Sequence, residues 1–189
     1  MEWTNEFTER LAQGYPDAYE ELVRLEWSQA VRTAWFILRN VHDAEEAAQE
    51  AFLSFYRNRN QLRDPRKVRS WLYRILVNSA RQQGRRRKSH VEWTDELALE
   101  ADLTSDPIQA ADRRLILHSA LKELSEDERT AVVLSYYTGL TDTEAATAAG
   151  WNLGKYKYRL AAGRRHLSRL MLKKEASRLH KEGFSDARG

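Results

Sequence analysis

The chain has 189 residues, a formal net charge of +3 and no cysteine. The lack of cysteine excludes disulfide bonds, thiolate metal sites and thiol nucleophiles. No apolar run approaches the roughly 18 to 20 residues that a membrane-spanning helix needs. The N-terminal stretch "MEWTNEFTER" also lacks the apolar core of a signal peptide. We therefore expect a cytoplasmic protein that does not insert into membranes.

The first half of the chain contains three predicted helix starts. Pro16 can open a helix over "DAYEELVRLEWSQAVRTAWFILRN", whose apolar side chains recur at helical spacing. Asp43 and Glu46 form a predicted capping box for "AEEAAQEAFLSFYRNR". Asp64 followed by Pro65 predicts a cap and a first-turn proline for "RKVRSWLYRILVNSARQQGRRRK". On that last helix Val68, Leu72, Ile75 and Ser79 are expected to face inward, and Trp71 is either a core residue or a base-stacking platform.

The second half repeats these signals. Its predicted helix starts are Asp106-Pro107, Ser125 with Glu128, and Thr141 with Glu144. Residues 89–106 are acidic and show no sustained period, which favours a flexible linker, and no alternation typical of β-strands is present. The predicted fold is all-α, with two small helical domains. We expect the N-terminal domain over 1–88, the linker over 89–106, the C-terminal domain over 107–175 and a basic tail over 176–189.

Charge is concentrated in two blocks. Residues 57–88 carry twelve basic side chains and one acidic side chain, and residues 155–181 carry ten and one. The first block follows the acidic stretch 1–56, and the second lies beyond the acidic stretch 89–112 and the weakly acidic stretch 113–154. This distribution favours two separate surfaces for a polyanion, although solvated helix faces remain an alternative reading.

The segment "TDTEAATAAGWNLGKYKYRLAAGRRHL" has the grammar of a helix-turn-helix. Gly150 can end the first helix in a left-handed conformation, and Asn152 can cap the second. One stripe of the second helix is apolar and should face the core, with Gly163 allowing close packing: Leu153, Tyr156, Leu160, Gly163, Leu167 and Leu170. The opposite face and its flank carry basic and hydrogen-bonding side chains suited to a major groove: Lys155, Lys157, Tyr158, Arg159, Arg164, Arg165, His166 and Arg169.

These motifs together resemble the extracytoplasmic-function sigma factors, the two-domain members of the sigma-70 family that direct bacterial RNA polymerase to promoters. In the N-terminal half the resemblance rests on "DAEEAAQEAFLSFY" and "RSWLYRILVNSARQQGRRR", and in the C-terminal half on "LSEDERTAVVLSYYTGLTDTEAA" and the positions from Gly150 to Leu167. The resemblance covers roughly residues 10 to 172, with both halves in the family's order. It implies a transcription initiation factor that helps to melt the promoter.

The resemblance assigns roles to three sets of residues. The β′ clamp of core RNA polymerase is expected to bind one face of a helix: Glu46, Gln49, Glu50 and Leu53. The minus-ten element, with a flipped base in the preceding loop, is expected to contact Asn58, Asn60, Gln61, Arg69, Arg74, Asn78, Arg81 and Arg85. The minus-thirty-five element is expected to contact Lys155, Lys157, Tyr158, Arg159, Arg164 and Arg165. The polymerase β flap and an anti-sigma factor are further implied partners.

Two other classes of function compete with this interpretation. A self-sufficient helix-turn-helix regulator would leave the acidic stripe around Glu46 and the first basic block without a role. A nucleic-acid enzyme is disfavoured, because no nucleophile–base constellation or phosphate-binding loop occurs and the five histidines are scattered. We expect no catalysis, no metal, no cofactor and no small-molecule substrate. The acidic linker is expected to thread through the polymerase by resemblance, or else to act only as a tether.

Overall fold

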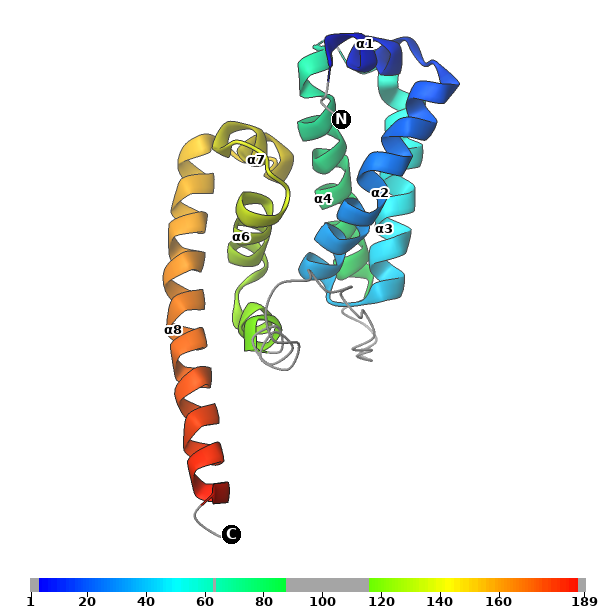
Figure 1. Ribbon diagram of the computed structural model, residues 1–189. Helices are drawn as coiled ribbons and strands as arrows, with labels where there is room; N and C mark the ends of the chain where they lie inside the picture. Colours follow the sequence, from blue (N-terminus) through cyan, green and yellow to red (C-terminus); the bar gives the residue numbers. More distant parts are fainter. Residues whose placement is uncertain (1–3, 63, 88–115, 187–189) are drawn as a thin grey trace.

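The computed structural model describes residues 4–62, 64–87 and 116–186, with the side chains of the last helix described as far as Lys173. Every regular element in these ranges is a helix, which confirms the all-α prediction. The predicted linker and the Asp106-Pro107 start lie outside the described residues. Figure 1 shows two groups of helices standing side by side.

The N-terminal group is a bundle of three long helices, and Figure 1 shows a short helix across one end of it. Its helices are α1 (Asn5–Gln13), α2 (Pro16–Leu38), α3 (Val41–Asn58) and α4 (Val68–Arg87). Two short 3₁₀ turns, η1 (Arg59–Gln61) and η2 (Pro65–Lys67), join α3 to α4. Small side chains on α3 let α2 and α4 approach it closely, because Ala44, Ala47, Ala48 and Ala51 are all fully buried.

The C-terminal group begins with a helical segment over residues 116–123. It continues with α6 (Glu126–Tyr137), α7 (Asp142–Ala149) and α8 (Leu153–Asp186). α8 is one unbroken helix that runs past the rest of the group (Figure 1). It therefore crosses the predicted boundary between the C-terminal domain and the basic tail without a break, and that boundary stays a prediction.

Most predicted helix ends are confirmed. Pro16 occupies the first turn of α2, and the capping boxes at Ser125 and Thr141 are both complete. Gly150 ends α7 in the left-handed conformation, with φ of 71°. The Asn152 side chain accepts a hydrogen bond of 2.7 Å from the backbone N–H of Lys155, at the start of α8. The predicted helix ends of the helix-turn-helix are therefore confirmed.

The predicted start of α3 is wrong. Asn40, not Asp43, is the N-cap residue, and its side chain accepts a hydrogen bond of 2.8 Å from the backbone N–H of Asp43. The helix begins at Val41, so Asp43 lies inside its first turn, where a carboxylate is favourable beside the helix dipole. Asn and Asp are both good caps, and the sequence alone did not distinguish them.

The predicted start of α4 is also too early. Asp64 accepts a hydrogen bond from the backbone N–H of Arg66, which caps the 3₁₀ turn η2, and the α-helix begins only at Val68. The buried face is wider than predicted because α4 packs on both α2 and α3. It adds five residues that the predicted stripe omitted: Ser70, Tyr73, Leu76, Val77 and Ala80. Ile75 is only half-buried.

Two further features differ from or sharpen the sequence analysis. α1 was not predicted, although Thr4 caps its start and Gly14 ends it with φ of 84°. On α8, Leu153 is exposed rather than part of the core stripe, because it lies at the first turn. Gly163 packs as expected, since a Cβ there would lie 2.8 Å from Val132 Cγ2 and 3.0 Å from the Glu128 carbonyl oxygen.

The two groups of helices pack against each other. α4 contacts α7, and α2 contacts α6. An aromatic cluster lies in this junction, with the ring centroid of Trp35 4.6 Å from that of His118 and the ring of Phe36 5.1 Å from that of Tyr137. Arg129 of α6 is buried in the same junction. One apolar core cluster therefore contains residues of both groups.

Candidate nucleic-acid interface

The outer face of α3 is an exposed ridge between two grooves. All four residues predicted to bind the polymerase clamp lie on this ridge and are exposed: Glu46, Gln49, Glu50 and Leu53. On one side, toward α2, a groove of about 510 Å³ is lined mainly by apolar side chains that include Tyr19, Trp27 and Phe52. The helical spacing of α3 brought the four ridge residues together as predicted. The aromatic groove floor combines two helices, and the sequence analysis missed it.

The groove on the other side of the ridge, toward α4, is polar. It has a volume of about 540 Å³, and Gln82, Gln83 and Arg86 form its far wall. Gln83 donates a hydrogen bond of 3.2 Å to Glu46 Oε2, while His42 Nε2 lies 3.3 Å from the other oxygen of Glu46. The ridge therefore presents carboxylate and amide groups with an apolar surface on one side and a polar surface on the other.

The end of α3 and the loop that follows it carry the first three residues of the predicted minus-ten set. Asn60 and Gln61 are exposed on η1, and Gln61 Nε2 donates to Asn58 Oδ1 at 3.1 Å. Asn58 in turn donates to the Ser54 carbonyl oxygen at 2.9 Å. α1 packs against both η1 and η2. The unpredicted helix thus supports the loop and leaves two of its amides at the surface.

Arg69 does not lie on an open face. Its Nε donates a hydrogen bond of 2.9 Å to Glu26 Oε1, and Glu26 is only 4% exposed. Tyr73 is completely buried, and its hydroxyl donates a hydrogen bond of 2.9 Å to the other carboxylate oxygen of Glu26. Burial, followed by the neighbouring charge of Glu26, raises the pKa of Tyr73. Arg69 therefore compensates a buried carboxylate inside the N-terminal bundle, a partner that its sequence context did not indicate.

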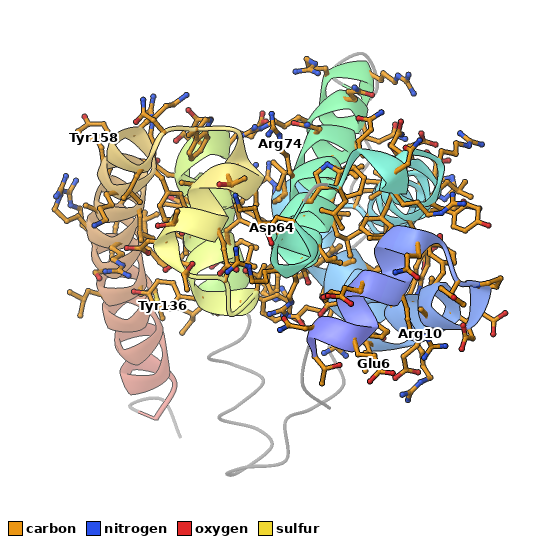
Figure 2. The ribbon with its side chains drawn as sticks, turned by 90° about the horizontal axis from the view of Figure 1, so that it is seen from above. Glu6, Arg10, Asp64, Arg74, Tyr136 and Tyr158 are labelled. Atoms are coloured by element: carbon orange, nitrogen blue, oxygen red, sulfur yellow. The ribbon has the colours of Figure 1, made fainter. Side chains whose placement is uncertain are left out.

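The other predicted minus-ten residues of α4 divide between exposed and covered positions. Arg74, Asn78 and Arg85 are exposed. Figure 2 shows Arg74 where α4 faces the C-terminal group. Arg81 is covered by that group, and its side chain is 16% exposed. Trp71 is half-buried with its ring centroid 5.0 Å from that of Phe55, so it packs on the bundle.

On α8, two of the predicted minus-thirty-five residues converge on one carboxylate. Asp127 of α6 lies 3.4 Å from Arg159 Nε and 3.9 Å from Lys155 Nζ. The Lys155 ammonium also lies 4.7 Å from the centroid of the Trp151 ring. Both cations remain more than a third exposed. Asp127 and Trp151 are functional candidates that the sequence analysis missed: Asp127 lies on another helix, α6, and Trp151 lies in the turn directly before α8.

The remaining predicted residues of α8 are spread along its surface. Lys157, Tyr158, Arg164 and Arg165 are exposed, and Tyr158 stands at the outer edge of α8 in Figure 2. The Arg164 guanidinium lies 5.1 Å from the centroid of the Tyr136 ring on α6. α8 therefore offers a basic, partly aromatic surface that begins directly after the helix-turn-helix corner.

Contacts behind this surface hold α8 against α6. Burial raises the pKa of Tyr156 to about 12, and its hydroxyl lies 3.4 Å from the Ala131 carbonyl oxygen. Although burial opposes ionisation, hydrogen bonds from Ser125 and His166 hold the pKa of Glu128 below its usual range. Gly163 allows the two helices to touch. These contacts hold the exposed basic face of α8 in a fixed position relative to α6.

Two absences concern the described part of the chain. Among its residues, no three His, Cys, Asp or Glu side chains gather closely enough to hold a metal ion. None of its helices combines the length and the apolar character that crossing a membrane requires.

Comparisons with known proteins agree with this geometry. Residues 19–90 match the family described as Sigma-70 region 2, and residues 114–167 match Sigma-70, region 4. The chain is 30% identical over 186 residues to the RNA polymerase sigma-H factor of Pseudomonas aeruginosa, which covers 90% of this chain and 95% of that protein. The chain belongs to the sigma-70 family, as an extracytoplasmic-function sigma factor. It is therefore a promoter-specific transcription initiation factor.

Two further sigma factors are similar to this chain over most of its length. The chain is 28% identical to the ECF sigma factor SigW of Bacillus subtilis, over 84% of this chain and 91% of that one. It is 32% identical to SigM of Mycobacterium tuberculosis, over 82% and 77% of the respective chains.

Two solved structures share the fold. One is CnrH in complex with the cytosolic domain of CnrY, with a TM-score of 0.66, 22% identity, and coverage of 90% of this chain and 97% of that one. The other is the sigma factor RpoE with the anti-sigma factor NepR from Bartonella quintana, with a TM-score of 0.64, 22% identity, and coverage of 81% and 96%. The predicted two-part helical architecture is therefore that of known sigma factors.

Proposed function

We propose that this sigma factor binds core RNA polymerase through the α3 ridge, defined by Glu46, Gln49, Glu50 and Leu53. The ridge is exposed, carries two carboxylates and is flanked by an apolar groove. A carboxylate surface repels DNA phosphates, so its partner is a protein. The clamp of the polymerase β′ subunit is the partner that family membership supports.

Promoter DNA is assigned to the two basic surfaces. The minus-ten element is read by the exposed amides of η1 and by the outer residues of α4, with Arg74, Asn78 and Arg85 at the surface. Amide side chains both donate and accept hydrogen bonds, as recognition of an unstacked base requires. Arg69 supports this surface from behind through Glu26.

The minus-thirty-five element is assigned to the start of α8. Lys155, Tyr158 and Arg159 follow the helix-turn-helix corner and project outward, as a recognition helix in a major groove requires. Arg165 lies farther along the helix and suits phosphate contacts. Lys157 and Arg164 flank the same face.

Further partners and limits of activity follow from the family. The C-terminal group is also expected to contact the polymerase β flap, and an anti-sigma factor is expected to regulate the chain. We infer that the protein catalyses no reaction itself and acts in the cytoplasm, where it directs the polymerase. The self-sufficient regulator is the alternative function, and the exposed acidic ridge is the observation against it.

The ridge assignment is tested by reversing its charge with Glu46→Lys and Glu50→Lys. Both side chains are exposed, and such positions usually change folding stability by less than about 0.5 kcal/mol. Like-charge contacts at an interface cost several kcal/mol. The double variant should therefore keep its circular dichroism spectrum and lose both core polymerase binding and promoter-directed transcription.

A matched control is Glu9→Lys with Glu20→Lys, which makes the same charge change at exposed positions of α1 and α2 outside both grooves. The control should bind core polymerase as the native chain does. Core binding retained by the folded ridge variant would overturn the clamp assignment. A self-sufficient regulator predicts unchanged or stronger DNA binding by both variants.

A further inference from the structure

One carboxylate stands among the residues assigned to the minus-thirty-five element. Asp127 lies in the first turn of α6, and its Oδ2 is 3.4 Å from Arg159 Nε and 3.9 Å from Lys155 Nζ. Among the described residues it is the only carboxylate that pairs with a member of the proposed minus-thirty-five set. A carboxylate repels DNA phosphates, so its presence in this surface does not serve affinity for DNA in general.

The start of α6 fixes the position of this carboxylate. In the capping box the Ser125 hydroxyl accepts a hydrogen bond of 3.3 Å from the backbone N–H of Glu128, and the Glu128 carboxylate accepts one of 3.0 Å from the backbone N–H of Ser125. Arg129 is buried and donates to the Leu124 carbonyl oxygen at 3.1 Å. Asp127 therefore lies in a capped turn between anchored residues.

Each of the two cations also has an aromatic neighbour. Lys155 and Arg159 are four residues apart, which places them on one face of α8. The Lys155 ammonium lies 4.7 Å from the centroid of the Trp151 ring, and the Arg159 guanidinium carbon lies 5.9 Å from the centroid of the Tyr158 ring. Aromatic rings attract such cations. The shared carboxylate and the two rings restrict the charged ends, and both cations remain more than a third exposed.

The ion pair engages the side of the Arg159 guanidinium. The closest approach of Asp127 is to Nε, so the end of the planar fork, formed by Nη1 and Nη2, stays available to a second partner. Two parallel N–H groups of an arginine match O6 and N7 of guanine in the major groove, which is the commonest specific contact between a side chain and a base. The geometry of Arg159 therefore suits a guanine.

The carboxylate also lowers the gain from binding to the wrong sequence. Phosphate contacts supply nearly all sequence-independent affinity for DNA. A phosphate that approaches Lys155 and Arg159 also meets the negative charge of Asp127, whereas the edge of a guanine carries no net charge. Side chains that are already held also lose less conformational freedom when they contact a base. Both effects favour the matched sequence over the others.

We infer that Asp127 is a positioning residue that determines specificity for the minus-thirty-five element. It directs Arg159, with Lys155 beside it, to a guanine on either strand, and it weakens phosphate binding at other sequences. This inference rests on the proposed function, because it concerns the same face of α8. It adds the identity of one base, and it gives a residue of α6 control over how strictly that base is read.

The test compares Asp127→Asn with Glu126→Gln in the full chain bound to core RNA polymerase. Both changes remove one carboxylate from the first turn of α6, but Glu126 pairs with Arg81 of α4, at 3.8 Å, and not with α8. Run-off transcription from a promoter library gives, at each upstream position, the ratio of initiation with the preferred base to initiation with the other three. This ratio measures how strictly the base is read.

Asp127→Asn should lower the ratio by about fivefold or more, which is part of the discrimination that one base contact supplies. The loss should fall at the position whose guanine preference also disappears in Arg159→Ala, and it should come mainly from increased initiation at mismatched promoters. Glu126→Gln should keep the native ratio. Both variants should keep the native midpoint of urea unfolding, because neither side chain is buried.

A second comparison asks whether Asp127 acts through the two cations. Asp127→Asn is combined with Lys155→Ala and Arg159→Ala. In that background it should change the ratio by less than about twofold, because the side chains that it positions are absent. A change that persists at full size would show that Asp127 contacts a base itself, such as the amino group of a cytosine, and would overturn the positioning role.

The remaining outcomes separate this inference from the proposed function. A native ratio in Asp127→Asn, or a preferred base other than guanine at the position that depends on Arg159, would overturn the inference and leave the proposed reading face intact. Loss of the native fold in Asp127→Asn would make Asp127 a residue of the fold and also overturn its positioning role. An upstream preference that Lys155→Ala with Arg159→Ala does not change would contradict the proposed reading face, and the inference with it.

Discussion

The helices α4 and α8 are both rich in basic residues, but the fold gives those residues different neighbours. On α4, Arg69 is bonded to the buried Glu26, and Arg81 is covered by the C-terminal group. On α8, Lys155 and Arg159 lie 3.9 and 3.4 Å from the carboxylate of Asp127, Lys155 also contacts the Trp151 ring, and both cations remain more than a third exposed. The basic residues of one sequence block therefore do not all lie on one exposed surface. The group opposite each arginine determines whether it supports the fold, joins the two groups or stays exposed.

The largest expected effect separates the supporting arginine from the exposed one. Arg69→Ala leaves the buried carboxylate of Glu26 without its cation, and removing one partner of a buried ion pair costs about 3–5 kcal/mol. Arg74→Ala changes an exposed residue of the same helix and should alter stability by less than about 0.5 kcal/mol. Urea unfolding followed by circular dichroism measures both.

Transcription sharpens this contrast. Arg74→Ala should lower initiation while leaving the fold intact, whereas Arg69→Ala should lose initiation together with the native N-terminal bundle. Equal stability of the two variants would show that Glu26 does not depend on Arg69, and the division of the α4 arginines would be wrong.

A smaller effect is expected within α8. Loss of a bidentate contact to a base costs about 1–3 kcal/mol at one position of the site. Lys155→Ala with Arg159→Ala should therefore change the preferred minus-thirty-five sequence. Arg165→Ala should weaken initiation at all sequences alike, because a phosphate contact carries no base information. Run-off transcription from a promoter library, with every upstream sequence represented, distinguishes the two outcomes.

That library experiment also tests the position of the recognition face. An unchanged upstream preference in the double variant, with reduced activity, would move Lys155 and Arg159 to the phosphate-contacting group. A changed preference in Arg165→Ala would extend the reading face farther along α8.

Local chemistry explains which features were predictable from the sequence. The capping boxes at Ser125 and Thr141, the left-handed Gly150 and the close packing of Gly163 each depend on residues a few positions apart or on one helix face. The exposed ridge of α3 follows from helical spacing in the same way. Such features depend only on residues within one turn or one helix, so a local sequence pattern predicts them.

The features that were missed depend on residues distant in the chain. Glu26 meets Arg69 across 43 positions, and Arg81 meets Ala149 across 68. The apolar groove beside the ridge needs α2 and α3 together. No local pattern marks these partners, so the roles assigned to the basic residues of α4 were less complete than those assigned to α8.

The most direct test of the central claim is reconstitution of initiation from purified parts. The native chain, core RNA polymerase and a library of fragmented DNA are combined, and the transcription start sites are mapped. The account predicts start sites only when both proteins are present, each preceded by two sequence motifs at a constant spacing. Specific binding by the chain alone to sites with two-fold symmetry, with no effect of core polymerase, would contradict it.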